Sequence, residues 1–482
     1  VDESKCSIYE GADVWSYTDE IDSIWKKSIV KDIGHIGELG GKVEVHVDVL
    51  DGEREIIKTK YEDDEIHEFQ HIKPRSNSHF NRITDIDLPA LPIINEPEIV
   101  ECLRHCFAEN VRYLSVGPVL LSINRHEVIP SVVNEKMYKN YFLVDKARQD
   151  IVNPIRADII KMAYEKYLKL HPSNVSFRSS GNQAVIMLGE SGGGKSRCTR
   201  ELCSHIAFIA AKLQRRLDTD TSFTPDIKFF DHVHTILESF GHAQTVSNIT
   251  SSRFSKAIKI TFSEKTGAIK GVIFRCFHLE MDRTTIQRPG ESNYNVFFDV
   301  FDDIYFAAQA MSKYGIDNLT TFRYAMTRPK TVFRPGKSSY KDLAAALDSI
   351  AKINKAKQNS SIFAVLAGIL HLGQIELEEV DNYGDVSTVF SSDPASVDHM
   401  NRVFKLLGIT LESLLAVVAK RSLNFAGNIV EKNLDLAESL VARDAFASQL
   451  YISLFRWVVS KVNAGIAELF CAANAEGTPT KS

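Results

Sequence analysis

The stretch Gly189-Glu-Ser-Gly-Gly-Gly-Lys-Ser196 decides the fold class, because it fits the phosphate-loop pattern G-x-x-x-x-G-K-[S/T] at every fixed position. An apolar run, Ala184–Leu188, precedes it and has the length of a buried strand. Apolar residues at helical spacing follow it, from Leu202 to Leu213. A strand, a glycine loop and a helix in this order predict an α/β fold of the P-loop NTPase type.

The residue types of this loop suit the binding of phosphate. Glycines let backbone N–H groups turn toward phosphate oxygens, and the new helix adds the positive end of its dipole. Lys195 can reach the outer phosphates, and the Ser196 hydroxyl can ligate Mg²⁺. The alternative is a glycine-rich turn with a surface lysine, which the flanking strand and helix disfavour. We therefore expect a phosphate cradle formed by Gly189, Glu190, Ser191, Gly192, Gly193, Gly194, Lys195 and Ser196.

The composition excludes several classes of protein. The 482 residues are 44% hydrophobic and 25% charged, which is ordinary for a soluble globular chain. The net charge of −5 shows no basic excess, so we expect no nucleic-acid partner. No apolar run approaches the roughly 20 residues of a spanning helix, so we expect no membrane insertion. The seven scattered cysteines, an odd number, favour a reducing compartment and a cytoplasmic location.

Residues 1–76 have the pattern of a small β module. Lys42–Val49 alternates strictly between apolar and polar residues, as a half-buried strand does. Asp51-Gly52 is a hairpin-turn dipeptide, and Glu53–Tyr61 returns as the next strand. Val14-Trp15 belongs to an earlier strand.

The remaining chain alternates between helical and strand patterns. Asn95-Glu-Pro97 is a typical helix start, with Asn as the cap and Pro in the first turn. Further along the chain we expect a buried strand at 119–123, helices over 133–170, two strands at 257–262 and 269–279, and helices at 362–372 and 443–462.

A second candidate site is a short polar loop that precedes the strand at 257–262. Small hydroxyls and a guanidinium suit a segment that folds over a γ-phosphate, although a solvated turn is an equally open interpretation from these residues alone. The loop contains Asn248, Ser251, Ser252, Arg253 and Lys256.

Together these segments resemble the myosin motor domain. The phosphate loop is similar to the family's G-E-S-G-A-G-K-T. Leu237–Thr245 is similar to L-E-A-F-G-N-A-K-T, and Asn248–Lys256 to the family's switch I, N-x-N-S-S-R-F-G-K. Three shorter segments also match in the family's order: Ile94–Pro97, Leu366–Gly373 and Arg443–Phe446.

The resemblance implies an architecture. Residues 1–76 would form an SH3-like N-terminal barrel, and 77–482 an incomplete motor domain. Within the latter, 77–215 would contain the phosphate loop and part of a central mixed sheet flanked by helices. Residues 216–482 would contain switch I and the mostly helical upper half of the actin-binding cleft.

The resemblance also implies roles for single residues. Lys195 and Asn248 would contact the phosphates of ATP, and Ser251 would help to position the attacking water. Arg253 would pair with a glutamate of switch II. The Mg²⁺ ligands would be Ser196 and Ser252, and Asn124 would lie on the adenine side.

The implied function is an ATP-driven, actin-based motor of the cytoskeleton. Hydrolysis of Mg-ATP would be coupled through phosphate release to binding of the actin filament. Light chains would bind beyond this part of the motor.

The sequence departs from the family pattern at its C-terminal side. Switch II, D-I-x-G-F-E, should follow the long helix, and no segment after that helix fits. Asp381–Gly384 has the D-x-x-G spacing, but its surroundings predict a surface loop. The chain would then lack a partner for Arg253. We expect a motor truncated before switch II, which alone binds nucleotide weakly and hydrolyses it poorly.

Other departures affect the base and the actin surface. Val128 and Val132 replace the family's Arg and Tyr beside the adenine, which predicts weak base selectivity. Asn428 occupies a position that is usually acidic or phosphorylatable in the actin-facing loop, although the nearby Glu431 could substitute for it. Switch I itself has Thr250 for the second Asn and keeps both serines.

Two other functions remain open from the sequence. The first is a non-motor pseudo-myosin, which binds nucleotide or a partner structurally. The second is an unrelated phosphate-loop ATPase or kinase, with Ile227–Asp231 as a metal-binding strand.

Overall fold

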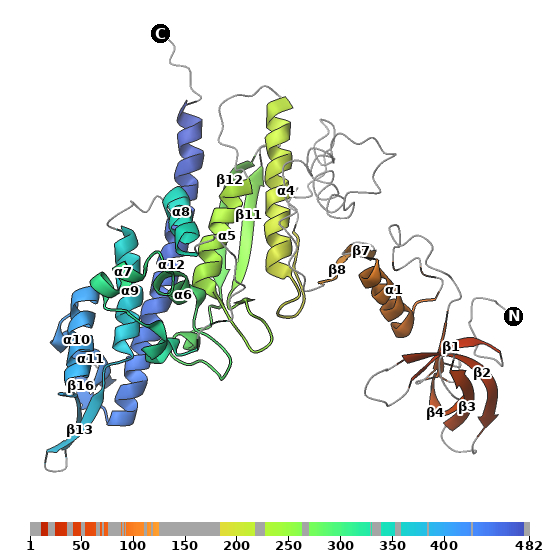
Figure 1. The fold of residues 1–482 in the computed structure, drawn as a ribbon, viewed down its shortest axis with the longest axis horizontal. Helices are drawn as coiled ribbons and strands as arrows, with labels where there is room; N and C mark the ends of the chain where they lie inside the picture. Colours follow the sequence, from red (N-terminus) through yellow and green to blue (C-terminus); the bar gives the residue numbers. More distant parts are fainter. Residues whose placement is uncertain are drawn as a thin grey trace, which may run out of the picture. The chain divides into compact units, whose positions relative to one another are not determined.

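The structure is a computed structural model, and Figure 1 shows its fold as a ribbon. The chain forms two compact units, residues 1–164 and 165–482. The residues that the structure describes are 11–17, 25–35, 42–49, 54–63, 68–69, 72–75, 88, 91, 93–109, 113–116, 119–124, 184–216, 227–262, 269–327, 329, 339–351, 358–382, 385–425 and 428–476.

The first unit begins with a six-stranded antiparallel sheet in the order β5-β4-β3-β2-β1-β6. The prediction of strands around 14–15, 42–49 and 53–61 is confirmed. The alternating pattern places valines such as Val45 and Val47 in a core with Val14, Val30 and Ile72. The strands are β1 Asp13–Tyr17, β2 Trp25–His35, β3 Lys42–Val49, β4 Arg54–Asp63, β5 Glu68–Phe69 and β6 Ile72–Pro74.

The described strands do not show the expected closed barrel. β5 and β6 are the two ends of the strand order, and no ladder joins them among the described residues. A barrel needs such a ladder, because closure removes both sheet edges. What the structure shows is a small antiparallel sheet.

Helix α1, Glu96–Ala108, starts where the sequence predicts. The Asn95 side chain accepts a hydrogen bond from the backbone N–H of Glu98 at 3.0 Å, as a helix cap does. Glu98 in turn accepts from the indole Nε1 of Trp15 at 3.0 Å, which joins α1 to the sheet.

The expected strand at 119–123 is present but is not fully buried. β8, Val119–Ser122, pairs with β7, Tyr113–Val116, and Val119 is exposed. The small core next to β8 includes Leu121 but not Val119. The helices expected over 133–170 lie outside the described residues.

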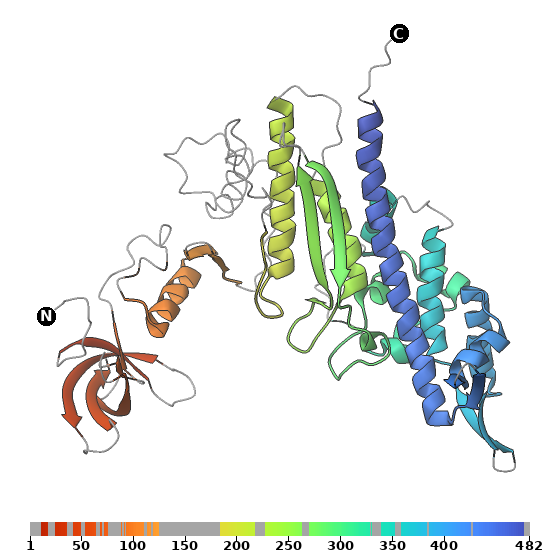
Figure 2. The same ribbon diagram turned by 180° about the vertical axis from the view of Figure 1, so that it is seen from behind.

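The second unit consists of helices and antiparallel hairpins (Figures 1 and 2). Strands β11 Ser255–Phe262 and β12 Ile269–Phe277 confirm the predicted hairpin. The helices expected at 362–372 and 443–462 correspond to α9, Gln358–Leu372, and α12, Leu436–Glu476. The other elements are α4 Lys195–Arg216, α5 Ile227–Gly241, β9 His242–Ala243, β10 Ser251–Ser252, α6 Asn295–Phe301, α7 Ala307–Gln309, α8 Ser339–Ala351, β13 Leu377–Asn382, β14 Asp385–Phe390, α10 Pro394–Leu407, α11 Leu411–Val418, β15 Lys420–Phe425 and β16 Asn428–Asn433, with the short helical turns η4 Asp282–Thr284, η5 Ala310–Tyr314, η6 Leu319–Thr321 and η7 Arg323–Ala325.

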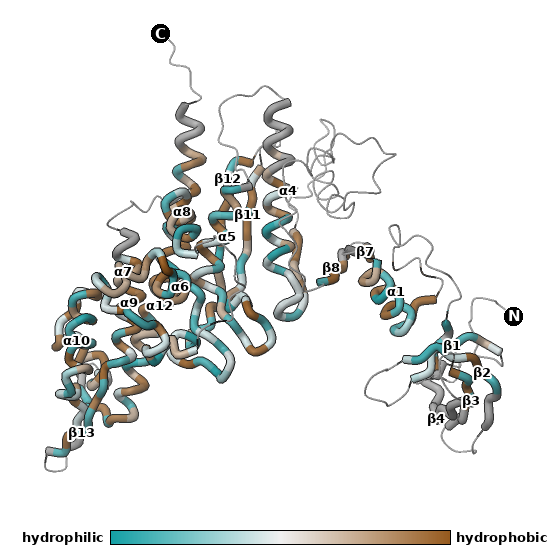
Figure 3. Tube along the Cα trace, viewed as in Figure 1, coloured by the Kyte–Doolittle hydropathy of each residue, from teal (hydrophilic) through white to brown (hydrophobic). Residues whose placement is uncertain are grey.

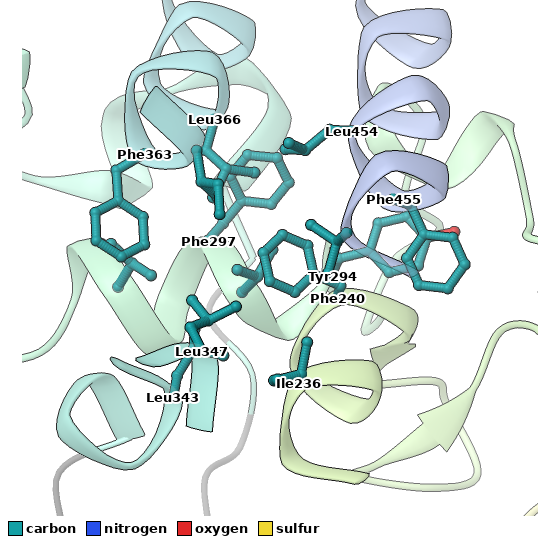
Figure 4. Packing of buried hydrophobic residues seen from close by; sticks show 14 of the residues in the cluster. Ile236, Phe240, Tyr294, Phe297, Leu343, Leu347, Phe363, Leu366, Leu454 and Phe455 are labelled. Carbon is teal, nitrogen blue, oxygen red and sulfur yellow. The ribbon is translucent and has the colours of Figure 1, made fainter. Parts of the chain in front are cut away.

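One large apolar core holds this unit together (Figure 4). α5 contributes Ile236 and Phe240, and the aromatic rings of Tyr294 and Phe297 lie between α5, α8, α9 and α12. The ring of Tyr294 stacks on that of Tyr451 with centroids 4.6 Å apart. Burial of such rings is the main stabilising term of the unit.

Helix α12 connects the core to the β11–β12 hairpin. Polar and apolar segments alternate along it (Figure 3). The Asn463 amide donates to the backbone carbonyl of Phe274 at 2.8 Å and accepts from its N–H at 2.9 Å. Tyr451 donates from its hydroxyl to the carbonyl of Phe240 at 2.6 Å. No described helix is long and apolar enough to cross a bilayer.

Three expectations from the sequence were wrong or incomplete. Ala184–Leu188 is not a buried strand: no described strand pairs with this segment, and Ile186 and Leu188 are exposed. The expected central mixed sheet is likewise absent from the described residues. Asp381 lies in hairpin β13–β14, paired with Val386, and not in a simple loop.

The kinase-type alternative loses its metal-binding strand. Residues 227–231 form the first turn of α5, and Phe229 and Phe230 are buried in the core. Together with Val233, Ile236 and Phe240, these two residues are spaced so that one face of a helix is apolar. This spacing favours a helix over a strand at 227–231.

Candidate functional site

The phosphate-loop segment turns sharply into the N-terminus of α4. Gly189, Gly192 and Gly194 have φ values of 137°, 86° and 89°, a region that side chains with a Cβ rarely adopt. The N–H of Gly193 donates to the carbonyl of Glu190 at 3.1 Å. The helix then begins at Lys195, and the first N–H groups of a helix have no partner inside it. This is the backbone arrangement that binds anions at helix N-termini.

Lys195 and Ser196, the last two residues of the phosphate loop, lie in the first turn of α4. Lys195 Nζ donates to the carbonyl oxygens of Gly189 and Glu190, both at 2.6 Å. The ammonium is thus folded back over its own loop. Ser196 follows it and is half-buried.

The second polar loop lies against this one. β9 and β10 pair antiparallel, so that the chain returns to place Ser251 opposite Ala243. The hydroxyl oxygens of Ser191 and Ser251 are 2.8 Å apart. A Cβ added at Gly192 would lie 3.5 Å from Nδ2 of Asn248. The two predicted segments therefore form one polar site, in which Ser251 is buried.

The expected magnesium ligands fit an oxygen-binding cation. The Ser252 hydroxyl donates its proton to the carbonyl of Phe254 at 2.8 Å, which leaves its oxygen lone pairs able to accept or ligate. Ser196 offers a second hydroxyl from the first turn of α4. Mg²⁺ prefers few protein oxygens and completes its shell with water and phosphate oxygens.

Arg253 has a partner inside this chain, which corrects the expectation that it would lack one. Its Nε donates to Oε2 of Glu280 at 2.6 Å, and its Nη1 donates to the Ser251 hydroxyl at 3.2 Å. The guanidinium thus connects a carboxylate to the hydroxyl that contacts the phosphate loop.

Glu280 belongs to a cluster of alternating charges. Arg283, which is buried, donates to both carboxylate oxygens of Glu280 and to Glu291. Partial burial raises the pKa of Glu280, but the hydrogen bonds from Arg283 and Arg253 outweigh it, so the pKa lies below its ordinary value. Glu280 is therefore ionised at neutral pH.

Lys256, the last candidate of the polar loop, contacts helix α5. It lies in β11, where its Nζ is 3.1 Å from Nδ1 of His234 on α5. Burial lowers the pKa of Lys256 and also lowers that of the neighbouring His242 to about 4. Lys256 and His234 therefore form a part-buried polar contact between β11 and α5.

The remaining expected residues are distributed over the chain. Asn124 lies in the first unit, after β8, and is exposed. Val128 and Val132 lie outside the described residues. Asn428 pairs with Phe425 at the turn end of hairpin β15–β16, and Glu431 accepts from Lys420 at 3.0 Å in the same hairpin.

Reasoning from the sequence missed the acidic side of this site. Glu280, Arg283 and Glu291 follow β12, and His278 just before them adopts a left-handed φ of 53°. The predicted hairpin could have indicated Glu280, because antiparallel pairing brings the residues after β12 next to those before β11.

Comparison with known proteins gives one family. The model of the myosin head (motor domain) matches residues 85–473. Myosin-15 of Arabidopsis thaliana is 29% identical over 385 residues, which are 79% of this chain and 23% of that protein. Myosin-52 of Schizosaccharomyces pombe is 26% identical over 471 residues, 95% of this chain and 28% of that protein. Myosin-4 of Saccharomyces cerevisiae is 26% identical over 426 residues, 88% and 27% respectively. The chain spans about a quarter of the length of these curated relatives.

Proposed function

This chain belongs to the myosin head (motor domain) family, an ATP-binding P-loop family, and we propose that it is the N-terminal part of an ATP-driven actin motor. The observation that supports this most directly is the contact of 2.8 Å between the Ser191 and Ser251 hydroxyls. It brings the phosphate loop and the switch I segment to one site, as a triphosphate bound between them requires.

The proposed division of labour follows from the chemistry of each side chain. Lys195 leaves its loop carbonyls to contact the β- and γ-phosphates, together with backbone N–H groups of residues 189–196 and the Asn248 amide. Ser251 orients the attacking water. When Mg²⁺ is bound by Ser196 and Ser252, it neutralises phosphate charge. Arg253 keeps Ser251 in place through their hydrogen bond of 3.2 Å.

Catalysis in this scheme is positioning and electrostatics. The transition state of phosphoryl transfer spreads negative charge over oxygens, so fixed N–H and hydroxyl donors stabilise it without reorganising. The rigid backing of the site supports such positioning. Phe254, directly after Arg253, packs on Phe455 of α12 with ring centroids 5.4 Å apart.

We also propose the finer architecture that the family implies. Residues 1–76 would close into an SH3-like barrel, and 77–482 would be an incomplete motor domain, with its central sheet completed outside the described residues. Actin filaments would bind the upper cleft half within 216–482, light chains would bind beyond it, and the protein would act on the cytoplasmic cytoskeleton.

A non-motor pseudo-myosin is the second candidate. The observation that favours it is Asn428, a neutral residue that pairs with Phe425 at one end of hairpin β15–β16. If this hairpin faces actin, as the family resemblance implies, it offers an amide where a negative charge is usual.

The steady-state ATPase of the complete protein, with and without actin filaments, separates the two candidates. Stimulation by actin supports the motor, and turnover that does not respond to actin supports the pseudo-myosin. Replacing Asn428 with Asp should raise the stimulation if the hairpin contacts actin. Titration of the same protein with ATP and GTP tests the expected weak base selectivity.

A further inference from the structure

Glu280 lies outside both phosphate-contacting segments, yet its carboxylate is joined to them. Arg253 donates to Glu280 at 2.6 Å and to the Ser251 hydroxyl at 3.2 Å, and Ser251 lies 2.8 Å from Ser191. One chain of polar contacts therefore runs from Glu280 to the phosphate loop.

The Glu280 end of this chain of contacts is fixed. The Arg283 side chain, only 3% exposed, donates to Oε2 of Glu280 at 2.7 Å and to Oε1 at 3.2 Å. The backbone N–H of Glu280 donates to the carbonyl of Arg253 at 3.0 Å, and its carbonyl accepts from the Tyr294 hydroxyl at 2.5 Å. Arg283 is itself fixed by Glu291 at 2.9 Å.

The Arg253 end is the exchangeable one. Its side chain is 26% exposed, and among the described residues it donates hydrogen bonds to the side chains of Glu280 and Ser251. Arg253, Arg283, Glu280 and Glu291 together are electrically neutral. Without Arg253, the remaining three side chains would have a net charge of −1. This negative charge attracts the Arg253 guanidinium back to Glu280.

We propose that Glu280 is a positioning residue for the nucleotide-binding loop: it holds Arg253, and through Arg253 the Ser251 hydroxyl, against the phosphate loop before nucleotide binds. This inference rests on the proposed function. It also means that Arg253 already has a carboxylate partner in the segment that follows β12.

The ligand-free 482-residue chain offers the first test, by hydrogen–deuterium exchange of the amides of residues 251–254. Glu280→Gln keeps the shape of the side chain and removes its charge, and Glu280→Ala removes the side chain. The matched control is Asp282→Asn, which removes one negative charge from an exposed carboxylate two positions after Glu280. Both Glu280 variants should raise the exchange rate about fivefold or more, and the control should not.

A double-mutant cycle shows whether Glu280 acts through Arg253. Arg253→Ala alone, Glu280→Gln alone and the double variant should show the same increase in exchange, because each breaks the same link. Additive increases, or equal exchange in wild type and both Glu280 variants, would overturn the proposal.

Nucleotide binding gives the second test and separates this inference from the proposed function. Glu280→Gln should weaken the affinity for a fluorescent ATP analogue with Mg²⁺ about tenfold, or 1.4 kcal/mol, whereas Asp282→Asn should not. If wild type binds the analogue and Glu280→Gln binds it equally well, the inference fails and the proposed function stands. If wild type does not bind and the exchange rates still differ as stated, the proposed function fails and the positioning role is supported.

Discussion

The hydroxyl oxygens of Ser191 and Ser251 lie 2.8 Å apart, although the two residues are 60 positions apart in the sequence. Ser191 belongs to the loop before α4, and Ser251 to the strand that pairs with β9. This contact defines the site, and several measurable consequences follow from its surroundings.

Removing either hydroxyl should loosen the contact between the two loops. We expect Ser191→Ala and Ser251→Ala each to weaken binding of a Mg-ATP analogue. The double variant should be weaker by less than the sum, with a coupling of about 1 kcal/mol, the usual net value of a hydrogen bond. Ser247→Ala, which changes an exposed serine of the same segment, is the control. Strictly additive losses would show that the hydroxyls act separately.

Gly241 at the end of α5 should not tolerate a side chain. A Cβ there would lie 2.3 Å from Cε1 of Phe254, which is itself packed against α12. Gly241→Ala should therefore reduce the free energy of unfolding by about 1–3 kcal/mol, the usual range for overpacking. Gly271→Ala is the matched control, since no atom lies within 4 Å of its added Cβ. Equal stability of the two variants in urea titrations would contradict this packing.

The left-handed backbone of His278 predicts an unusual response to substitution. His278 is exposed and has a φ of 53°, so its side chain adds strain without packing. His278→Val should lower the free energy of unfolding by about 1–2 kcal/mol, because a β-branched residue is least compatible with this region. His278→Gly should be neutral or stabilising. Arg275→Val, at an exposed position within β12, should hardly change the free energy of unfolding. An equal loss of stability in Arg275→Val and His278→Val would show that the backbone of His278 is not strained.

The pH dependence of stability should include a contribution from His242. Burial lowers its pKa to about 4, against an ordinary value of 6.5. The unfolded chain therefore binds a proton at a higher pH than the folded chain, and stability should fall as the pH decreases from 6.5 to 4. The full loss is roughly 3 kcal/mol, at about 1.36 kcal/mol per pKa unit.

His242→Leu should remove this contribution, which is measured by urea titration of both proteins at several pH values. The comparison with wild type matters, because Asp299 acts in the opposite direction. Burial raises its pKa to about 6, so the folded chain binds that proton first and gains stability below pH 6. If the curves of wild type and His242→Leu ran parallel between pH 6.5 and 4, the account of His242 would be wrong.

Much of this structure could be predicted from local patterns. The alternation in Lys42–Val49 and the cap at Asn95 depend on neighbouring residues only, so both were predicted with nearly correct bounds. The phosphate loop was recognisable because its glycines are required by the backbone itself. In each case a short stretch contains the whole physical reason.

What could not be predicted depends on residues distant in the sequence. Ile186 and Leu188 have the composition of a buried strand, but strand formation requires a hydrogen-bonded neighbour, and none is described. Asp231 lies in helix α5 because the buried side chains of that helix, such as Val233 and Ile236, recur at helical spacing. Glu280 became visible as a partner of Arg253 only when the hairpin register was known.

The central claim is that this site binds a nucleoside triphosphate, and the most direct measurement is titration of the 482-residue chain with a fluorescent ATP analogue and Mg²⁺. We expect saturable binding that Lys195→Ala weakens at least about tenfold, the equivalent of 1.4 kcal/mol. Lys259→Ala, which removes an exposed lysine of β11, should leave it unchanged. Absence of binding by the wild-type chain, or equal binding by Lys195→Ala and wild type, would contradict the account.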